Sequence, residues 1–268
     1  MKRHILITAL LLSFVVSAAA QNNQITAMRN VVPDGYNFWV YTPQEYDSLQ
    51  HRTPVIIFLH GASLCGHDLN RVRRYGPLQA LTLGRTIPAL IIAPQNPGGA
   101  WNPRRINNVL EWTREHYPCD STRIYVYGMS LGGYGTLDFA GTYPEKVAAA
   151  MALCGGTTLK NLHGLGKLPL WIMHGTADRA VPVKQSQIVV SAMKANNETE
   201  RLRYDWLPGA SHGALARMFY LQKTYDWLFS HALTDSLRPV ERGIIINQSD
   251  FPQAYRNMNK TTAPRIVF

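Results

Sequence analysis

The chain has 268 residues, of which 46% are hydrophobic and 16% are charged, and its formal net charge is +10. This apolar content excludes a disordered chain and is enough for one large buried core. The basic residues are scattered rather than gathered in a stripe, and no nucleic-acid-binding module is recognisable, so no nucleic-acid partner is expected.

The first twenty residues have the pattern of a secretory signal peptide. Lys2 and Arg3 precede an apolar run from Ile5 to Val16, and small residues follow as far as Ala20. The run is shorter than the roughly 20 residues that span a bilayer, so we expect cleavage after Ala20 rather than a membrane anchor. We therefore expect a secreted or periplasmic protein without a membrane span.

Strand and helix patterns alternate along the rest of the chain. Residues 25–41 contain β-type residues around a Pro-Asp-Gly turn and predict an N-terminal hairpin. Apolar runs predict buried strands at residues 54–59, 89–93, 124–127, 147–153, 170–173 and 201–207. Helical spacing is present at residues 107–116, 131–142, 184–195 and 215–229.

This alternation predicts an α/β protein with a mostly parallel central sheet and helices on both faces, because parallel strands need crossover connections. Ligands of such sheets bind at the carboxyl ends of the strands, so functional residues are expected on the loops that follow strands. Residues 233–268 lack clear periodicity. We predict a signal peptide at 1–20, one α/β domain at 21–232, and an irregular extension at 233–268 that packs on the domain or trails from it.

Three cysteines follow the predicted signal peptide. Cys119 precedes its predicted strand, whereas Cys65 and Cys154 follow theirs, so Cys119 is expected at the opposite end of the sheet. A disulfide to Cys119 is disfavoured by the short Cα separation that a disulfide needs. The spacing suggests neither a zinc site nor a redox pair, and we expect free cysteines.

A G-x-S-x-G motif at residues 128–132 lies between the predicted strand 124–127 and the predicted helix 131–142. In this context the serine occupies a tight turn that exposes its hydroxyl, and the turn leaves no room for side chains at Gly128 and Gly132. The helix that begins there directs free N–H groups at the same point. The pattern predicts that Ser130 is a nucleophile.

A serine hydroxyl needs a base to remove its proton. In this fold the acid and the histidine follow the serine in that order, each on a loop after a later strand. Asp178 lies on the loop that leaves strand 170–173, and His212 lies on the loop after strand 201–207. We therefore predict a catalytic triad of Ser130, Asp178 and His212.

Other acids and histidines fit these roles less well. Asp205 is inside a predicted strand and Asp226 is inside a predicted helix. His174 is too close to the acid strand to act as the base, and we expect a structural role for it. His163 lies in the 154–168 connection, where a substrate contact is an unsupported hypothesis.

The oxyanion of an acyl-transfer intermediate needs two backbone donors. The residue after the nucleophile, Leu131, supplies the first. The second is expected from the loop after strand 54–59, where Gly61 allows close approach and Ala62 is the predicted donor, with Ser63 as the alternative. A different interpretation is that His60 and Gly61 merely end a strand.

Substrate contacts are less marked in the sequence. Trp101 follows the strand 89–93 and is a candidate aromatic wall or sugar-stacking surface, although an ordinary packing role fits equally well. Ser63 is a second candidate contact. The 154–168 connection is short and rich in glycine, which argues against a large lid and favours an open site for polymer-linked esters.

The segments PVIIFLHGAS, ALIIAPQNPGGAWNP, IYVYGMSLGGYGTLDFA, LWIMHGTAD and PGASHG resemble single-domain secreted α/β-hydrolases. The similar groups are feruloyl and acetylxylan esterases, polyhydroxybutyrate depolymerases, and the phospholipase/carboxylesterase and predicted-peptidase group. The resemblance implies the α/β-hydrolase fold and a serine carboxylesterase without a metal or organic cofactor. Dienelactone hydrolases are similar in outline but use cysteine, and Ser130 departs from that pattern.

We therefore expect a secreted esterase that acts on small-molecule or polysaccharide-linked esters, with acetyl or feruloyl esters of plant polysaccharides as leading substrates. Two alternatives remain at this point: a serine peptidase that acts on small peptides, and a non-catalytic binding protein on a hydrolase scaffold. The sequence does not define an oligomeric state.

Overall fold

The computed structural model describes residues 23–43, 46 and 52–268. The predicted signal peptide at 1–20 lies outside the described residues. Within them, no helix combines the length and the apolar character that a membrane crossing requires.

The described residues form a central sheet of nine strands in the order β8-β7-β6-β5-β3-β4-β2-β1-β9. Strand β2 runs antiparallel to both β1 and β4, and the remaining pairs are parallel. The prediction of a mostly parallel sheet is confirmed. The strands are β1 (Gln24–Met28), β2 (Phe38–Thr42), β3 (Thr53–Leu59), β4 (Leu90–Pro94), β5 (Cys119–Met129), β6 (Ala149–Leu153), β7 (Leu170–Gly175), β8 (Leu202–Leu207) and β9 (Arg265–Val267).

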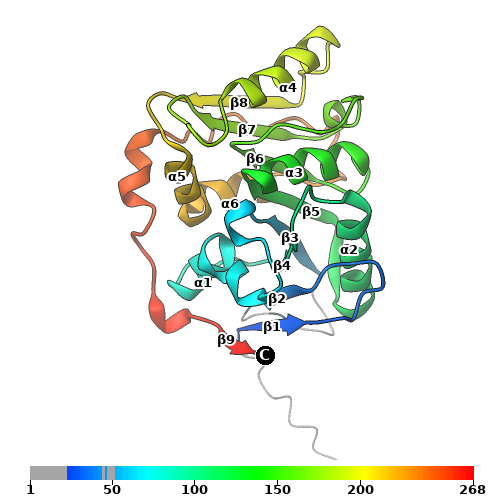
Figure 1. The fold of residues 1–268 in the computed structure, drawn as a ribbon, viewed down its shortest axis with the longest axis vertical. Helices are drawn as coiled ribbons and strands as arrows, with labels where there is room; N and C mark the ends of the chain where they lie inside the picture. Colours follow the sequence, from blue (N-terminus) through cyan, green and yellow to red (C-terminus); the bar gives the residue numbers. More distant parts are fainter. Residues whose placement is uncertain (1–22, 44–45, 47–51) are drawn as a thin grey trace, which may run out of the picture.

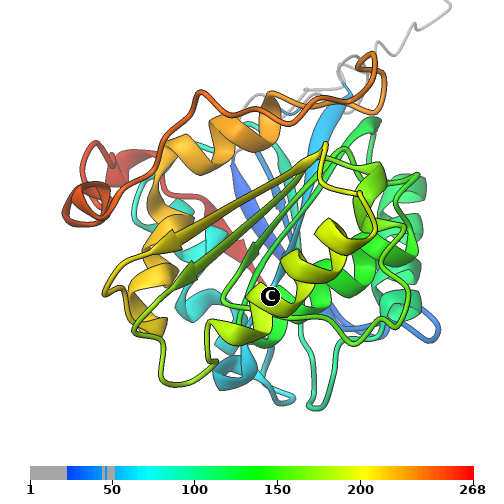
Figure 2. The same cartoon turned by 90° about the horizontal axis from the view of Figure 1, so that it is seen from above.

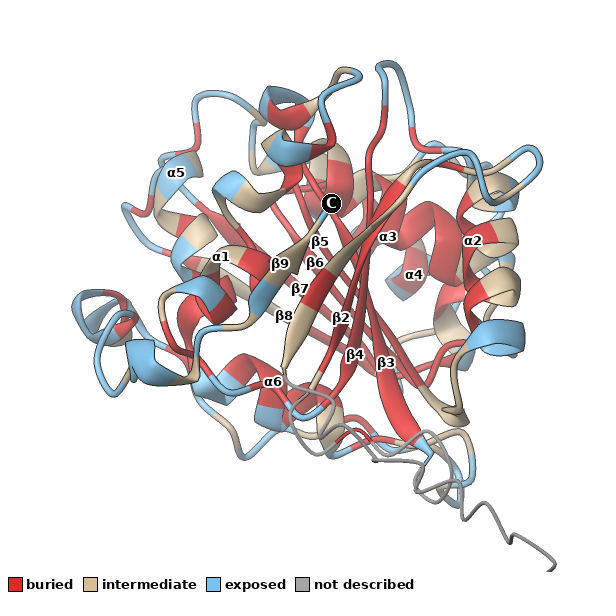
Figure 3. Ribbon diagram, turned by 90° about the horizontal axis from the view of Figure 1, so that it is seen from below, coloured by how far each residue is buried: buried red, intermediate tan, exposed pale blue. Residues whose placement is uncertain are grey.

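Helices cover both faces of this sheet (Figures 1 and 2). Side chains of α2, α3 and α4 belong to one apolar core, and side chains of α1, α5 and α6 belong to the other. The central strands are buried on both faces (Figure 3). The helices are α1 (Pro77–Thr82), α2 (Pro103–His116), α3 (Leu131–Thr142), α4 (Lys184–Ala195), α5 (His212–Leu215) and α6 (Gln222–Phe229).

Strand β3 shows why a continuous apolar run folds in this way. Successive side chains of a strand point to opposite faces, and Ile56 and Phe58 enter the core under α1 and α6 while Val55 and Ile57 enter the core under α2 to α4. A strand with one polar face would leave one of these cores incomplete. Strand β3 therefore fixes the middle of the sheet, next to β5.

Two helix predictions differ from the structure. Helix α2 begins at Pro103, earlier than predicted, because the Asn102 side chain accepts the N–H groups of Arg104 and Arg105 and caps the helix. The predicted single helix at 215–229 is interrupted by a 3₁₀ segment (Ala216–Tyr220) and by the extended backbone of Leu221. Periodicity alone did not show this interruption, nor the short helix α1.

The segment 233–268 packs along the domain and ends in the edge strand β9, which pairs in parallel with β1 (Figure 1). Phe251 and Ala254 are buried in the core with α1 and α6. The buried guanidinium of Arg85 donates to the carbonyls of Tyr220 at 2.6 Å and Ala254 at 3.2 Å. The segment thus contributes both to the core and to the sheet edge, a role that its lack of periodicity did not reveal.

Removing the Phe251 side chain tests this role. Phe251 is 5% exposed, so Phe251→Ala is expected to lower the free energy of unfolding by about 3 kcal/mol through lost burial and the cavity left behind. Urea denaturation measures the change. Ile245→Ala in the same segment is the control, because Ile245 is 59% exposed and its truncation should change stability by about 0.5 kcal/mol or less. Equal effects of the two changes would contradict a core role for the segment.

Candidate active site

Ser130 lies between the end of β5 and the start of α3, in a strained backbone conformation with φ 61° and ψ −124°. Such a conformation is costly for a residue with a side chain and persists only where its surroundings enforce it. The Ser130 N–H donates to the carbonyl of Leu153 at 2.8 Å. A Cβ at Gly132 would lie 1.8 Å from the Leu59 carbonyl oxygen, so only glycine fits there. These contacts hold Ser130 at the carboxyl edge of the sheet.

Asp178 and His212 are brought together by the loops that follow β7 and β8. Asp178 is buried, and its Oδ2 lies 2.7 Å from Nδ1 of His212. Its Oδ1 accepts the N–H groups of Ala180 at 2.9 Å and Val181 at 2.8 Å. Burial opposes ionisation of this carboxyl, but the His212 ring and the backbone donors outweigh it and hold the pKa of Asp178 below its ordinary value.

Ser130 occupies the same edge of the sheet, because β5, β6, β7 and β8 pair in parallel in consecutive order. Among the described residues, no hydrogen bond joins Ser130 Oγ to His212. Such bonds are often long in unliganded hydrolases and shorten when substrate binds. The structure therefore pairs the acid with the histidine and leaves the serine hydroxyl available at the same edge.

The loop after β3 lies against the serine. A Cβ at Gly61 would be 3.2 Å from Cβ of Ser130. The Gly61 N–H is already used, because it donates to the hydroxyl of Tyr75 at 2.6 Å. Among the described residues, the N–H groups of Ala62 and Leu131 have no acceptor. Tyr75 has no motif around it, and sequence analysis did not identify its contact with this loop.

His60 connects this loop to the one after β4. Its Nε2 accepts the N–H of Asn96 at 3.0 Å, and its carbonyl accepts Nε1 of Trp101 at 3.2 Å. The ring is fully buried, and burial lowers the pKa of His60 to about 4. The neutral imidazole is thus part of the support of the loop, and His60 does more than end a strand.

Trp101 is a packing residue at the centre of this region. It is 3% exposed, with its ring centroid 4.9 Å from that of His60 and 5.2 Å from that of Tyr36. A Cβ at Gly135 of α3 would lie 2.7 Å from the indole, so the ring packs directly on that helix. Its two faces are covered, and we revise the candidate sugar-stacking surface to a packing role.

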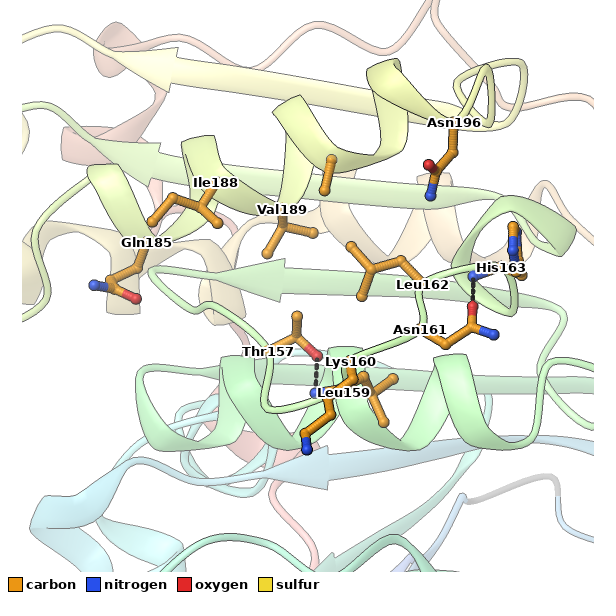
Figure 4. Close-up of a pocket in the computed structure, with 11 residues that line it drawn as sticks. Thr157, Leu159, Lys160, Asn161, Leu162, His163, Gln185, Ile188, Val189 and Asn196 are labelled. Atoms are coloured by element: carbon orange, nitrogen blue, oxygen red, sulfur yellow. Dashed lines mark hydrogen bonds between the residues drawn. The ribbon is translucent and has the colours of Figure 1, made fainter.

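The competing acids and histidines have other partners. Asp205 accepts Nε1 of Trp171 at 2.6 Å, and Asp226 accepts from the Gln222 side chain on the surface of α6. His163 contacts Glu198 and lines a pocket of 360 Å³ between the 157–163 connection and α4 (Figure 4). None of these residues replaces Asp178 or His212.

The three cysteines are free. Cys154 is buried directly after β6. Cys154, His174 and Asp178 each place one potential ligand atom within 4.8 Å of the others. His212 and two backbone N–H groups already use the Asp178 oxygens, so these atoms serve a hydrogen-bond network rather than an open coordination site.

The chain is similar in sequence to hydrolases and esterases. The dienelactone hydrolase family matches residues 101–223. Acetylxylan esterase A of Emericella nidulans is 27% identical over 164 residues, which cover 55% of this chain and 51% of the relative. The chain thus spans about half the length of the curated relatives that it matches.

Two solved structures have the same fold. A thermostable esterase superposes with a TM-score of 0.60 at 25% identity, covering 73% of this chain and 59% of the other. The feruloyl esterase module of Clostridium thermocellum superposes with a TM-score of 0.54 at 17% identity, covering 72% and 83%. The fold is that of esterases of the α/β-hydrolase type.

The buried His60 predicts a pH dependence of stability. Its pKa is lower in the folded chain, about 4, than the ordinary 6.5, so the unfolded chain binds a proton between these values and the folded chain does not. The contribution of His60 to the free energy of unfolding is fully present above pH 6.5. It decreases as the pH falls towards 4, by about 3 kcal/mol in total.

The comparison protein is His60→Gln, which should be less stable at pH 7 but should lose less stability between pH 6.5 and pH 4. Urea denaturation at several pH values measures the difference. Other buried histidines titrate in both proteins and cancel. Parallel pH profiles would show that His60 is not held neutral by its contacts.

Proposed function

We propose that the chain is a serine esterase of the α/β-hydrolase superfamily, which hydrolyses carboxylic esters through an acyl-enzyme on Ser130. The observation that carries the proposal is the 2.7 Å contact between Asp178 and His212 at the sheet edge where the strained turn presents Ser130. A serine of this kind becomes a nucleophile only when a histidine accepts its proton.

In the proposed mechanism, His212 takes the proton of Ser130 as the hydroxyl attacks the ester carbonyl, and then passes it to the leaving alcohol. The same ring next removes a proton from water, which attacks the acyl-enzyme, and returns this proton to Ser130 Oγ as the acid is released. Asp178 holds the imidazole in the required tautomer and stabilises its charged form. The N–H groups of Ala62 and Leu131 stabilise the oxyanion of both tetrahedral intermediates.

We propose acetyl or feruloyl esters of plant polysaccharides as the substrates. The curated relatives are acetylxylan esterases, and one fold neighbour is a feruloyl esterase module. The short 154–168 connection supports an open site that accepts polymers. A secreted or periplasmic location, proposed from residues 1–20, would place the enzyme with such substrates.

Replacing Ser130 tests the reaction. Ser130→Ala should lower kcat for p-nitrophenyl acetate and methyl ferulate by at least about 10³-fold, because the nucleophile is lost while the oxyanion donors remain. Acid release from acetylated and feruloylated xylan tests the substrate class. Ser191→Ala on the exposed face of α4 is the control and should match the parent enzyme.

The outcomes separate the alternatives. Ester turnover that depends on Ser130 supports the esterase, and failure to release either acid from xylan rejects the polysaccharide substrate. Turnover of a peptide anilide alone would favour a serine peptidase. A folded protein without turnover or fluorophosphonate labelling would indicate a binding protein on a hydrolase scaffold.

The proposed oxyanion donor can be removed without a large change of shape. Ala62 is exposed at the first position of a 3₁₀ turn, and Gly61 before it is extended, so proline fits the backbone there. Ala62→Pro removes the N–H and should lower kcat by about 10²-fold to 10³-fold with little change in KM.

Ala62→Gly keeps the N–H and is the matched control, with kcat expected within a few-fold of the parent. If Ala62→Pro retains full activity, the second donor is not Ala62. The same substitution at Ser63 then tests the alternative donor by the same kinetic measurement.

A further inference from the structure

A second histidine contacts the Asp178 carboxylate. His174, on β7 four residues before Asp178, is 0% exposed in its side chain. Its Nε2 lies 3.3 Å from Oδ2 of Asp178 and 2.9 Å from the carbonyl oxygen of Val181. The same Oδ2 is the atom that His212 Nδ1 approaches at 2.7 Å. One carboxylate oxygen is therefore shared by two imidazole rings.

The neighbours of His174 determine where its proton lies. A backbone carbonyl and a carboxylate only accept hydrogen bonds, so Nε2 must carry a hydrogen to satisfy Val181 and Asp178. Burial lowers the pKa of His174, and this effect is larger than the raising effect of the negative charge of Asp178. The ring is therefore neutral, with its proton on Nε2. In this tautomer His174 is a donor to the carboxylate and does not compete for the role of base.

The other ring nitrogen ties the acid loop to the nucleophile helix. Nδ1 lies 2.7 Å from Oγ of Ser186 on α4, and that Oγ lies 2.5 Å from the carbonyl oxygen of Gly155. With the ring proton on Nε2, both Nδ1 and this carbonyl are acceptors, so the single hydroxyl hydrogen of Ser186 lies between them. A Cβ at Gly155 would lie 2.5 Å from the backbone of Gly133 in α3. The network thus runs from Asp178 through His174 and Ser186 to the first turn of the helix that follows Ser130.

We propose that His174 is a positioning residue, whose Nε2–H holds the Asp178 carboxylate and limits how much of its charge acts on His212. This inference rests on the proposed esterase function. Without the His174 donor, the carboxylate would interact more strongly with the protonated form of His212. His212 would then hold its proton to higher pH and would be a less available base at a given pH.

The expected consequence is a change in the pH profile. The titratable groups that face this site are Asp178, His212, His174 and the Cys154 thiol, and burial raises the pKa of that thiol so that it stays neutral. In a serine hydrolase the acidic limb of kcat/KM reports protonation of the general base in the free enzyme. Loss of the His174 donor should move this limb upward by roughly half to one pH unit.

Two substitutions of His174 distinguish the role of Nε2 from the role of Nδ1. His174→Gln places an amide near the former Nε2 and keeps a donor for Asp178, whereas His174→Asn places it near Nδ1 and keeps only the partner for Ser186. We expect the acidic limb of kcat/KM to move to higher pH in the Asn variant. In the Gln variant this limb should stay at the pH of the unsubstituted enzyme. His231→Gln is the matched control, because His231 is a buried histidine just after α6 whose Nε2 accepts the N–H of Glu241 away from this site.

Unshifted acidic limbs in both His174 variants would overturn the proposal, and so would an equal shift in all three variants. Where a variant does not fold, imidazole nitrogen NMR of the unsubstituted chain tests the same point: a proton on Nε2 of His174 supports the proposal, and a proton on Nδ1 alone rejects it. Absence of Ser130-dependent ester turnover in the unsubstituted chain would instead reject the proposed function, and the NMR result would still report on the His174 contact.

Discussion

Parallel pairing of neighbouring strands is the constraint on which the site depends. Strands β5 to β8 end at one edge in consecutive order, with Leu153 opposite Met173 and Gly175 opposite Leu207. The loop residue Ala210 then approaches Gly175 so closely that a Cβ there would lie 2.1 Å from the Ala210 carbonyl oxygen. Asp178 and His212 can meet at 2.7 Å because the strands before them are fixed in this register.

The burial that fixes this edge also fixes the ionisation of its polar groups. His60 and His174 are fully buried, and burial lowers the pKa of both rings. Each ring has a backbone carbonyl, an acceptor only, at one of its nitrogens, so that nitrogen carries a hydrogen. Asp178 differs because His212 and the N–H groups of Ala180 and Val181 donate to it, so its carboxyl stays charged in the same surroundings. A negative charge is therefore held at Asp178, where it orients the imidazole that acts as the base in the proposed mechanism.

The sequence was sufficient for features that depend on local chemistry or on strand order. The G-x-S-x-G turn needs glycines for steric reasons, and Asp178 and His212 follow their strands in the expected order, so these residues could be named in advance. Trp101 could not be assigned, because an aromatic residue after a strand has the same pattern whether its ring is exposed or packed on Gly135. Tyr75 and Ser186 escaped notice because their contacts join segments far apart in the chain. Strand β9 has only three residues, and its place beside β1 is set by tertiary packing.

The role expected for His174 changed for a similar reason. Its position, four residues before Asp178 on the same strand and loop, excluded it as a base and suggested a structural part. The structure adds the partners of its two ring nitrogens. Because the partners of Nε2 can only accept, this nitrogen is a donor to the acid and the ring does more than fill space. A phenyl ring of similar size would fill the space, but it would leave Asp178, Val181 and Ser186 without their partner, and buried polar groups without partners are costly. The polar network around Asp178 thus makes imidazole the side chain that both fills this site and orients its charge.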